Sequence, residues 1–352
     1  MEYPKFKVAV CCITYNQSKY ITDAMNGFTI QQTDFPFVCT IVDDASTDGE
    51  QEVIRKYVEE NFDFSEGSVA FQKETDYAYI TYAQHKTNKN CYFAVLYLKE
   101  NHYSQKKDKS PYLKEWMDTA IYLATCEGDD YWTVYNKLQK QVDFLDSHPN
   151  YVMCSHTYDN LIENEHIIKK NKYFSRLRYM RDKEFEYYKI TLDNYWKVWV
   201  TQPLSCMVKG YFEIQNQIPR NKYKLLHDVI FYYYVIKQGT GALLSDNMGV
   251  YRINEGGIWS GKSNIQRYKL KMSQMLNIYK VEEDIRCLCE LPKMFSLLMC
   301  QYIKQFQISN LVDDLKYYSK QVPNKYILKG ICFIPLQFVL IILKKIKMII
   351  TR

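Results

Sequence analysis

Three continuous apolar runs in the first half of the chain predict buried β-strands. They cover residues 7–14, 37–42 and 120–124, and the first run is rich in β-branched residues. Shorter runs at 69–72 and 151–155 predict two further strands.

Amphipathic stretches separate these runs. Helices are predicted at 20–30, 51–61, 91–100 and 135–145. The polar face of the last helix is expected to hold Lys137, Lys140 and Gln141. The charged stretch 104–114 predicts an exposed insertion or long loop, and from about residue 265 the pattern is helical. Alternating strands and helices predict an α/β fold with a mostly parallel central sheet in three layers.

The C-terminal end carries a strongly apolar segment at 331–343, followed by Lys344, Lys345 and Lys347. The segment is shorter than the ~20 residues that a membrane-spanning helix needs, and it contains Pro335. Two interpretations stay open for the end at 331–352. It is either a helix docked on the protein or an interfacial anchor whose lysines lie at the lipid headgroups.

Composition narrows the classes of function. With 352 residues the chain has room for one large α/β domain and an appendage, or for two modest domains. The formal net charge of +6 suits anionic small molecules or a membrane surface, but no long basic tract indicates nucleic acid. The 11 cysteines follow no metal-knuckle or disulfide spacing, and no signal peptide precedes the first strand. We therefore expect reduced thiols in a cytoplasmic protein.

The most informative motif is Glu127-Gly128-Asp129-Asp130, which comes directly after the apolar run at 120–124. Acids at the end of a strand lie at the carboxyl edge of an open α/β sheet, where ligands bind. Like charges this close repel one another, so folding them together requires a cation or solvent. A hard divalent ion is one solution, and an ordinary solvated acidic turn is the alternative.

A second acidic pair, Asp43-Asp44, ends the run at 37–42. In a doubly wound sheet this pair and the acids at 127–130 can converge on one ligand. The chain has no Gly-x-Gly-x-x-Gly or Walker sequence, which weakens dinucleotide and P-loop interpretations. A phosphate site without such a loop needs another counter-charge, and carboxylate-held Mg²⁺ or Mn²⁺ supplies it.

Three segments together resemble a known family in order and spacing. They are 10–16 (Val-Cys-Cys-Ile-Thr-Tyr-Asn), 42–49 (Val-Asp-Asp-Ala-Ser-Thr-Asp-Gly) and 127–132 (Glu-Gly-Asp-Asp-Tyr-Trp). The combination resembles family 2 glycosyltransferases with the GT-A fold. The resemblance implies an inverting, nucleotide-sugar-dependent enzyme of hexosyltransferase type. It places a GT-A domain at 1–262, with a nucleotide-sugar part at about 1–132 and an acceptor part at about 133–262, and a helical region at 263–352.

The resemblance implies roles for the first two strand ends. Thr14, Tyr15 and Asn16 would hold the nucleoside, with the Tyr15 ring stacked on the base. Asp44 would accept a hydrogen bond from a uracil-type N–H, with Asp43 beside it. The alternative is that Asp43 caps the following helix while Tyr15 only packs.

In the acidic motif, the resemblance makes Asp129 the strongest metal ligand. Glu127 stands in the first position of an Asp-x-Asp-like motif, where it would contact ribose or the metal, directly or through water. Asp130 would orient the donor sugar or a neighbouring loop. The Mn²⁺ or Mg²⁺ ion would bridge both phosphates and neutralise charge on the departing diphosphate.

An inverting transfer also needs a general base for the acceptor hydroxyl. In the segment 225–231 the resemblance gives this role to Asp228, at the start of a helix that stabilises its carboxylate. His227 is a lesser rival, and the alternative for Asp228 is a simple N-terminal charge.

Residues 251–260 resemble the loop that closes over the diphosphate. Arg252 would supply positive charge, and Trp259 would stack on a sugar or anchor the loop by burial. Many relatives carry a His, sometimes a metal ligand, where this chain has Asn254. An amide oxygen coordinates a hard cation less strongly, so we expect either weaker metal binding or a metal site completed by water.

The sequence therefore predicts a metal-dependent glycosyltransferase that moves a sugar from a nucleotide-sugar, foremost a UDP-sugar, to a glycan or lipid-linked saccharide. The expected setting is surface polysaccharide biosynthesis in the cytoplasm, with peripheral contact at the inner face of the cell membrane. Two rival functions stay open. One is a non-catalytic relative that binds a nucleotide or glycan within a biosynthetic assembly. The other is a nucleotidyltransferase, which the missing phosphate loop disfavours.

Overall fold

The computed structural model describes residues 3–118, 120–171, 187–198, 202–223, 228–254 and 261–334. The chain divides into two compact units. The first comprises Met1–Thr191, Trp199–Ile218 and Tyr232–Ile253. The second comprises Leu192–Val198, Pro219–Phe231 and Asn254–Arg352.

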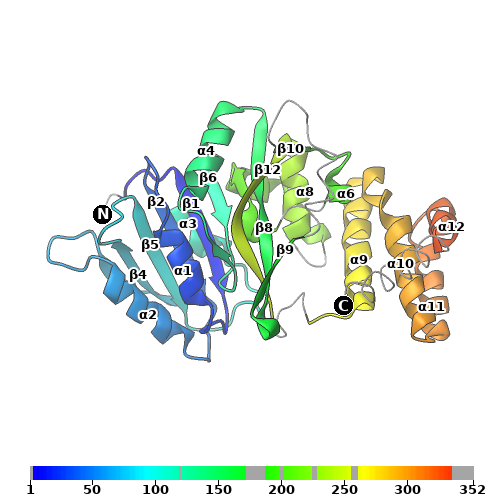
Figure 1. The fold of residues 1–352 in the computed structure, drawn as a ribbon, viewed down its shortest axis with the longest axis horizontal. Helices are drawn as coiled ribbons and strands as arrows, with labels where there is room; N and C mark the ends of the chain where they lie inside the picture. The colour runs from blue at the N-terminus through cyan, green and yellow to red at the C-terminus, as the bar shows by residue number, and fades with distance from the viewer. Residues whose placement is uncertain are drawn as a thin grey trace. The chain divides into compact units, whose positions relative to one another are not determined.

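Four parallel strands form the centre of the first unit (Figure 1). In spatial order they are β6 (Tyr122–Thr125), β1 (Val8–Thr14), β2 (Phe37–Asp43) and β5 (Cys91–Leu98). Every residue of β2 and β5 is buried. Parallel strands covered on both faces have continuous apolar sequences rather than alternating ones, as β1 and β2 do.

Further strands extend the sheet on both sides, and their pairs are antiparallel except for the parallel pair of β8 with β12. β4 (Ala78–Gln84) pairs with β5, and β3 (Phe71–Glu74) pairs with β4. Beyond β6 the order continues through β11 (Met207–Lys209), β8 (Tyr151–Ile162), β12 (Thr240–Ile253) and β10 (Tyr187–Ile190). β7 (Tyr131–Trp132) pairs with β12, and β9 (Ile167–Lys170) pairs with β8. The β7–β12 pair brings the residues after the acidic motif next to β12.

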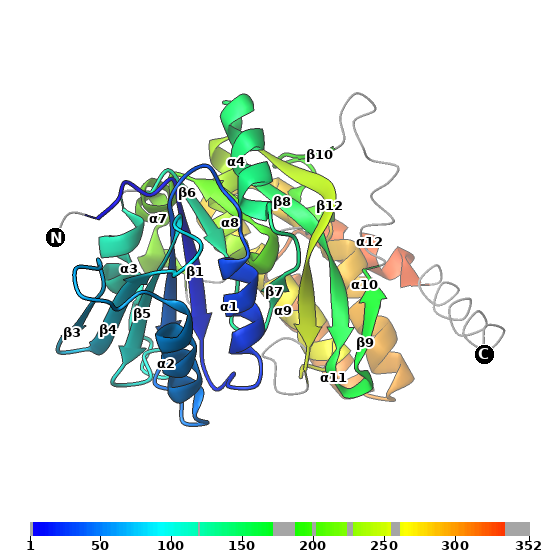
Figure 2. The ribbon, with the colours of Figure 1, turned by 60° about the vertical axis from the view of Figure 1, so that its left-hand side comes forward.

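Helices cover both faces of the central strands. One apolar core combines alternate residues of β1 and β2 with residues of α1 (Ile21–Thr29), α2 (Glu50–Asn61) and α4 (Lys137–Ser147). α1 and α2 lie together in the foreground of Figure 2. α3 (Ser110–Met117) packs against β1 and β2 from the opposite face. This three-layer α/β/α arrangement confirms the predicted fold class.

Shorter elements are α7 (Tyr211–Gln217) and the 3-10 turns Glu163–Glu165, Pro203–Ser205, Arg220–Lys222 and Ile285–Leu288.

The second unit is helical, as predicted for the C-terminal region. Its helices are α6 (Tyr195–Val198), the first turn of α8 (Asp228–Gln238), α9 (Asn264–Glu282), α10 (Leu291–Lys304), α11 (Ile308–Ser319) and α12 (Asn324–Cys332). α9 begins with a capping box, in which Ser263 and Gln266 each accept a hydrogen bond from the other's N–H. α10 packs against α9, α11 and α12. Within the described residues, no helix has both the length and the apolar character needed to span a bilayer.

Residues 91–98 form strand β5, so the helix predicted at 91–100 is wrong. A continuously apolar run of eight residues cannot be assigned to helix or strand by periodicity alone. β5 lies between β2 and β4, and pairing with both neighbours decides its structure. The polar stretch before it holds β4, and the charged stretch 104–114 holds the start of α3 at Ser110.

Lys137 and Gln141 lie on the buried face of α4, which corrects their predicted place on its polar face. Lys137 has no exposed surface, and its ammonium lies 3.7 Å from the centre of the Trp132 ring. Burial lowers the pKa of Lys137 to about 7. The buried Gln141 amide donates to two main-chain carbonyl oxygens. Both residues share i, i+4, i+8 spacing with the buried Leu145, so they follow the apolar stripe of the helix.

Replacing Lys137 with Met is expected to remove a pH-dependent part of the stability. The folded-state pKa of about 7 lies below the usual 10.5, so the unfolded chain binds this proton more tightly. The buried charged ammonium therefore destabilises the folded state fully below pH 7, and this destabilisation decreases as the pH rises towards 10.5. Between pH 7 and 9 the free energy of unfolding of the wild type should therefore rise by about 2–3 kcal/mol relative to that of the Lys137→Met variant.

Urea unfolding at several pH values measures this gain. The exposed Lys56, whose side chain is 77% accessible, provides the control Lys56→Met. Parallel pH profiles for the wild type and Lys137→Met would contradict the assignment of a neutral buried lysine.

Candidate functional site

The carboxyl ends of β1, β2 and β6 lie at one edge of the sheet because the three strands are parallel neighbours. Thr14 at the end of β1 is in register with Asp43 at the end of β2. The connections that follow these strands hold residues 15–20, 44–49 and 126–130. The structure thus brings together the three motifs on which the family resemblance depends.

The acidic motif places three carboxylates within reach of one ion. One oxygen from each of Glu127, Asp129 and Asp130 lies within 4.8 Å of the other two. Glu127 is exposed, Asp129 is partly exposed and Asp130 is buried, so the cluster opens to solvent on one side. Carboxylate oxygens with room for water are the ligands that Mg²⁺ and Mn²⁺ prefer.

Asp130 is the most strongly perturbed acid of the cluster. Its Oδ1 accepts a 2.8 Å hydrogen bond from the Arg252 N–H, while its buried Oδ2 has no hydrogen-bond partner among the described residues. Burial, and then the charges of Asp129 and Glu127, raise the pKa of Asp130 well above its usual range. A buried oxygen without a partner is unfavourable, and a cation at the cluster would satisfy it. The residues present therefore fit a divalent ion.

Arg252 fixes the acidic loop to β12. Its Nε donates to the Asp129 carbonyl oxygen at 2.9 Å, and its terminal nitrogens pair with Glu163 at 2.8 Å and Asp23 at 2.6 Å. The guanidinium also lies 4.4 Å from the centre of the Tyr20 ring. Two carboxylates already balance its charge. In this structure Arg252 therefore positions the loop, and its predicted contact with a diphosphate stays a prediction.

Gly128 lets the acidic loop approach the end of β1. A Cβ added at Gly128 would collide with Thr14 Oγ1 and would lie 2.5 Å from Gln17 Oε1. Any other residue here would force a shift of the Thr14 and Gln17 side chains or of the acidic loop itself. Thr14 is 2% exposed, so in this structure it supports the acidic loop from within.

Side chains join the connection after β1 to the connection after β2. The Asn16 N–H donates to Ser46 Oγ at 2.9 Å, and Asn16 Oδ1 accepts from the Thr47 N–H at 2.8 Å. Asn16 has a φ of 55°, in the left-handed region that Asn tolerates better than most residues. Tyr15 is 45% exposed as a residue, so it lies outside the core and is accessible to a flat ligand.

Asp43 is fully buried and binds both the connection that follows it and the first turn of α2. Its Oδ1 accepts from the Ser46 N–H at 3.1 Å and from the Gln51 amide at 2.6 Å. Burial raises the pKa of Asp43, although these hydrogen bonds oppose the shift. The N-cap of α2 is Gly49, with a φ of 87°, so Asp43 does not cap this helix.

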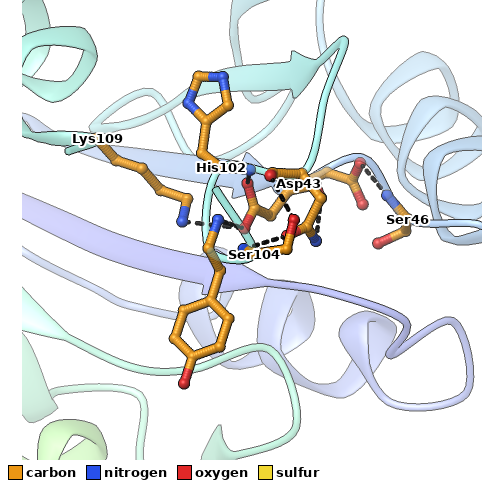
Figure 3. Close-up of polar contacts among 8 residues, drawn as sticks. Asp43, Ser46, His102, Ser104 and Lys109 are labelled. Atoms are coloured by element: carbon orange, nitrogen blue, oxygen red, sulfur yellow. Dashed lines mark hydrogen bonds and ion pairs between the residues drawn. The ribbon is translucent and has the colours of Figure 1, made fainter. Parts of the chain in front are cut away.

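Asp44 anchors the turn that follows β5. Figure 3 labels His102 and Lys109 of this turn, together with Asp43, which precedes Asp44 in sequence. Its carboxylate accepts from the N–H groups of His102 at 2.8 Å and Tyr103 at 3.0 Å, and it forms a 2.9 Å ion pair with Lys109. The Asn101 amide donates to the Asp44 carbonyl oxygen at 3.0 Å. The side chain of Asp44 is only 2% exposed. Its role at a nucleobase stays a prediction.

Four predicted residues belong to the second unit. Asp228 is exposed and is the first residue of α8, where the helix dipole stabilises a carboxylate. Asn254 directly follows β12. His227 and Trp259 lie outside the described residues. The roles of all four stay predictions.

Two residues of the site are absent from the sequence-based prediction. Glu50 accepts hydrogen bonds from both connections described above, and Lys109 pairs with Asp44. Spacing could have revealed Glu50, because it shares i, i+4, i+8 positions with the buried Ile54 and Val58. Lys109 lies in a charged stretch whose pattern does not distinguish it from its neighbours.

The curated relatives of this chain carry names that assign no activity. They include "Uncharacterized protein Mb1547" from Mycobacterium bovis and "Uncharacterized protein Rv1520" from Mycobacterium tuberculosis. Each is 29% identical over 261 residues, which is 72% of this chain and 60% of the relative. The chain thus spans less than two thirds of the length of these relatives. No protein-family model matches it.

Solved structures give a clearer likeness. Mannosyltransferase PcManGT from Pyrobaculum calidifontis, in complex with GDP-Man and Mn²⁺, matches 94% of this chain with a TM-score of 0.51 and 12% identity. The match covers 87% of that protein. This chain has the GT-A fold.

A second solved structure, S. aureus TarS 1–349 in complex with UDP, matches 83% of this chain and 69% of its own, with a TM-score of 0.44 and 16% identity. That likeness is too weak to add to the argument. At such low identities the comparisons show the fold alone, and the chemistry rests on the residues of the site.

Gly128→Ala is expected to weaken Mn²⁺ binding by about tenfold or more, because residues that orient metal ligands typically contribute 10–100-fold to metal affinity. The added methyl group must push the acidic loop away from Thr14 and Gln17. Titration of Mn²⁺, followed by the loss of the free-ion electron paramagnetic resonance signal, measures the affinity.

Gly239→Ala is the matched control. Its Cβ would lie 2.8 Å from Val152 Cγ1 and 3.2 Å from the Asn150 carbonyl oxygen, in a crowded place outside the acidic loop. We expect it to lower stability and leave Mn²⁺ affinity unchanged. Equal loss of affinity in both variants would show that the effect is general destabilisation.

Proposed function

We propose that this protein is a metal-dependent, inverting glycosyltransferase of family 2 that uses a nucleotide-sugar, with a UDP-sugar as the first donor to test. One observation carries the proposal. Three carboxylates gather within 4.8 Å at the carboxyl edge of parallel strands in a GT-A fold. Mannosyltransferase PcManGT, which shares this fold, was solved with GDP-Man and Mn²⁺. Both facts support a nucleotide-sugar and Mn²⁺ or Mg²⁺ for this chain.

The metal would be held by Asp129 and Glu127 at the open side of the cluster and by the buried Asp130. When bound, the ion supplies positive charge against the donor diphosphate and the departing nucleoside diphosphate. Two cationic side chains near these loops are already paired with carboxylates, which supports the need for the charge of a metal ion. Arg252 is paired with two carboxylates and Lys109 with one. Asn254 is a further candidate ligand.

The nucleoside would lie against the connections after β1 and β2. The exposed ring of Tyr15 supports stacking on the base, and base stacking on an aromatic ring contributes about 1–3 kcal/mol. Asn16 and Asp43 would hold these connections in place through the hydrogen bonds described above. Asp44 would face the base edge together with the turn that it anchors. Trp259 would contact the donor sugar or close the loop.

The acceptor hydroxyl would lose its proton to Asp228. In an inverting transfer the acceptor oxygen attacks the anomeric carbon on the face opposite the leaving diphosphate, so the base must lie on the acceptor side. Asp228 is exposed at a helix N-terminus, where the helix dipole favours a carboxylate, and both features suit this role.

The proposed acceptor is a glycan or lipid-linked saccharide in surface polysaccharide synthesis, met at the cytoplasmic face of a membrane. The apolar end predicted at 331–352 lies outside the described residues from 335 onwards, and the preceding helix α12 (Asn324–Cys332) supports a membrane contact at this end of the chain. Leu328 is 61% exposed and Ile331 is 40% exposed, while Gly330 packs against α10. Lys325 and Lys329 belong to the same helix. An exposed apolar face flanked by lysines suits an interface with anionic lipid.

Asp129→Asn is expected to remove most of the stabilisation by Mn²⁺ with UDP. A ligand at 100 times its Kd raises the free energy of unfolding by about 2.7 kcal/mol, and a 100-fold weaker ligand leaves about 0.4 kcal/mol. Thermal-shift measurements with nucleoside diphosphates, with and without Mn²⁺, test this. Asp118→Asn, at a side chain that is 49% exposed, is the control. A wild-type protein that no nucleotide stabilises would overturn the proposed function.

Asp228→Asn is expected to lower the rate of sugar transfer by about 10²–10⁴-fold and to leave Mn²⁺–UDP binding intact. A donor–acceptor transfer assay measures this. Glu213→Gln, at an exposed acid in the first turn of α7, is the control. Transfer at the wild-type rate would remove Asp228 as the base. A wild type that binds Mn²⁺–UDP but transfers nothing to a broad acceptor panel would identify the non-catalytic relative.

Leu328→Ser with Ile331→Ser is expected to reduce binding to phosphatidylglycerol-containing vesicles by at least about tenfold, because each apolar side chain contributes on the order of 1.5–3 kcal/mol when buried. Vesicle co-sedimentation measures the change. Ile121→Ser, at a side chain in the first unit that is 42% exposed, is the control. Equal binding of all three proteins would exclude α12 as a lipid contact.

A further inference from the structure

Glu50 is a buried carboxylate with no part in the chemistry proposed above. It is the first residue of α2 and has no exposed surface. Three donors converge on it: the Thr14 hydroxyl, the Gln17 N–H at 2.9 Å and the Ser46 hydroxyl at 2.8 Å. Burial raises the pKa of Glu50, although these three hydrogen bonds oppose the shift.

The donors come from two different connections. Thr14 and Gln17 belong to the end of β1 and the connection after it, while Ser46 belongs to the connection after β2. Ser46 Oγ in turn accepts from the Asn16 N–H. Glu50 therefore ties together the two connections on which the proposed nucleoside site depends.

Glu50 also connects to the acidic loop through its partners. The two atoms that an added Cβ at Gly128 would meet first are Thr14 Oγ1 and Gln17 Oε1. Thr14 Oγ1 is the donor to Glu50, and the Gln17 N–H is the second donor to it. The surface against which Gly128 rests is thus built from residues that Glu50 holds.

We propose that Glu50 is a positioning residue for the acidic loop, an inference that rests on the proposed function of that loop in metal binding. Through Thr14 and Gln17 it fixes the place of Gly128. The two acids on either side of Gly128 then take their positions from a carboxylate that touches neither of them. Because metal affinity depends on ligand placement, loss of Glu50 weakens the metal site from a distance.

A carboxylate suits this position because it only accepts hydrogen bonds and has about four lone-pair sites for three donors. Glutamine has the same size but offers one accepting oxygen and turns an NH₂ group towards the other donors. Glu50→Gln therefore keeps the packing and disturbs the hydrogen bonds. Valine at position 14 removes the hydroxyl donor in a similar way.

Mn²⁺ titration by electron paramagnetic resonance tests the inference on Glu50→Gln, Thr14→Val and the double variant. We expect the Kd for Mn²⁺ to rise by about tenfold or more in each single variant. Because both substitutions disrupt the same Thr14–Glu50 contact, the double variant should bind Mn²⁺ about as weakly as whichever single variant has the lower affinity. Glu52→Gln is the matched control, since Glu52 is an exposed acid in the same helical turn. It should bind Mn²⁺ like the wild type.

Urea unfolding of each variant separates positioning from stability. Wild-type Mn²⁺ affinity in Glu50→Gln, with or without a loss of stability, overturns the inference and leaves the proposed function standing. Full additivity in the double variant also overturns it, because the two residues would then act independently. A wild-type protein that binds no Mn²⁺ overturns the inference and the metal-dependent function together. If Glu50→Gln does not fold, an unchanged Kd in Thr14→Val overturns the inference.

Discussion

Repulsion among Glu127, Asp129 and Asp130 is the constraint on which the rest of the site depends. The three carboxylates lie within 4.8 Å of one another, and one of them is buried. Like charges at this distance in a partly buried place raise the free energy of the folded state. The loop that carries them is held by contacts with distant parts of the chain. Arg252 binds it from β12, and Thr14 and Gln17 support Gly128 from the β1 side.

The same constraint explains how the protein uses its cations. Arg252 serves Asp23 and Glu163, and Lys109 serves Asp44. These three ion pairs hold together segments near the carboxyl edge of the sheet. A diphosphate brought to this edge would meet more negative charge in the acidic loop. A divalent ion bound at the cluster would offset the three carboxylates and attract the phosphates.

The sequence predicted the parts of this arrangement that are encoded locally. Strands β1, β2 and β6 are continuous apolar runs, and the residues that follow them in sequence necessarily lie at their carboxyl ends, including the acids after β2 and β6. Contacts between distant segments were beyond reach. No local pattern shows that β5 pairs on both sides, or that Arg252 meets Asp23 more than two hundred residues away.

Glu50 and Lys137 illustrate a different limit. Both are charged residues at stripe positions of amphipathic helices, shared with buried apolar residues at i+4 or i+8. Charge alone suggests solvent exposure, and spacing alone suggests burial. The burial that spacing indicates occurs when the folded structure supplies hydrogen bonds to the buried charged group, or when the group can be buried in its neutral form. Glu50 accepts three hydrogen bonds, whereas the Lys137 ammonium lies over the Trp132 ring and burial lowers its pKa.

The contacts that Asp44 already makes determine the free-energy cost of a hydrogen bond between its carboxylate and a nucleobase. Its carboxylate already accepts two main-chain N–H groups and pairs with Lys109. Hydrogen bonds to a charged group contribute about 1.5–3 kcal/mol each, so releasing all three would cost more than the about 1–3 kcal/mol that base stacking returns. Exchange of the Lys109 contact alone for a base N–H is nearly balanced, because one charge-assisted bond replaces another. Direct recognition of a base by Asp44 is therefore compatible with this structure only if the turn at 101–109 keeps its main-chain bonds to Asp44 and Lys109 moves aside.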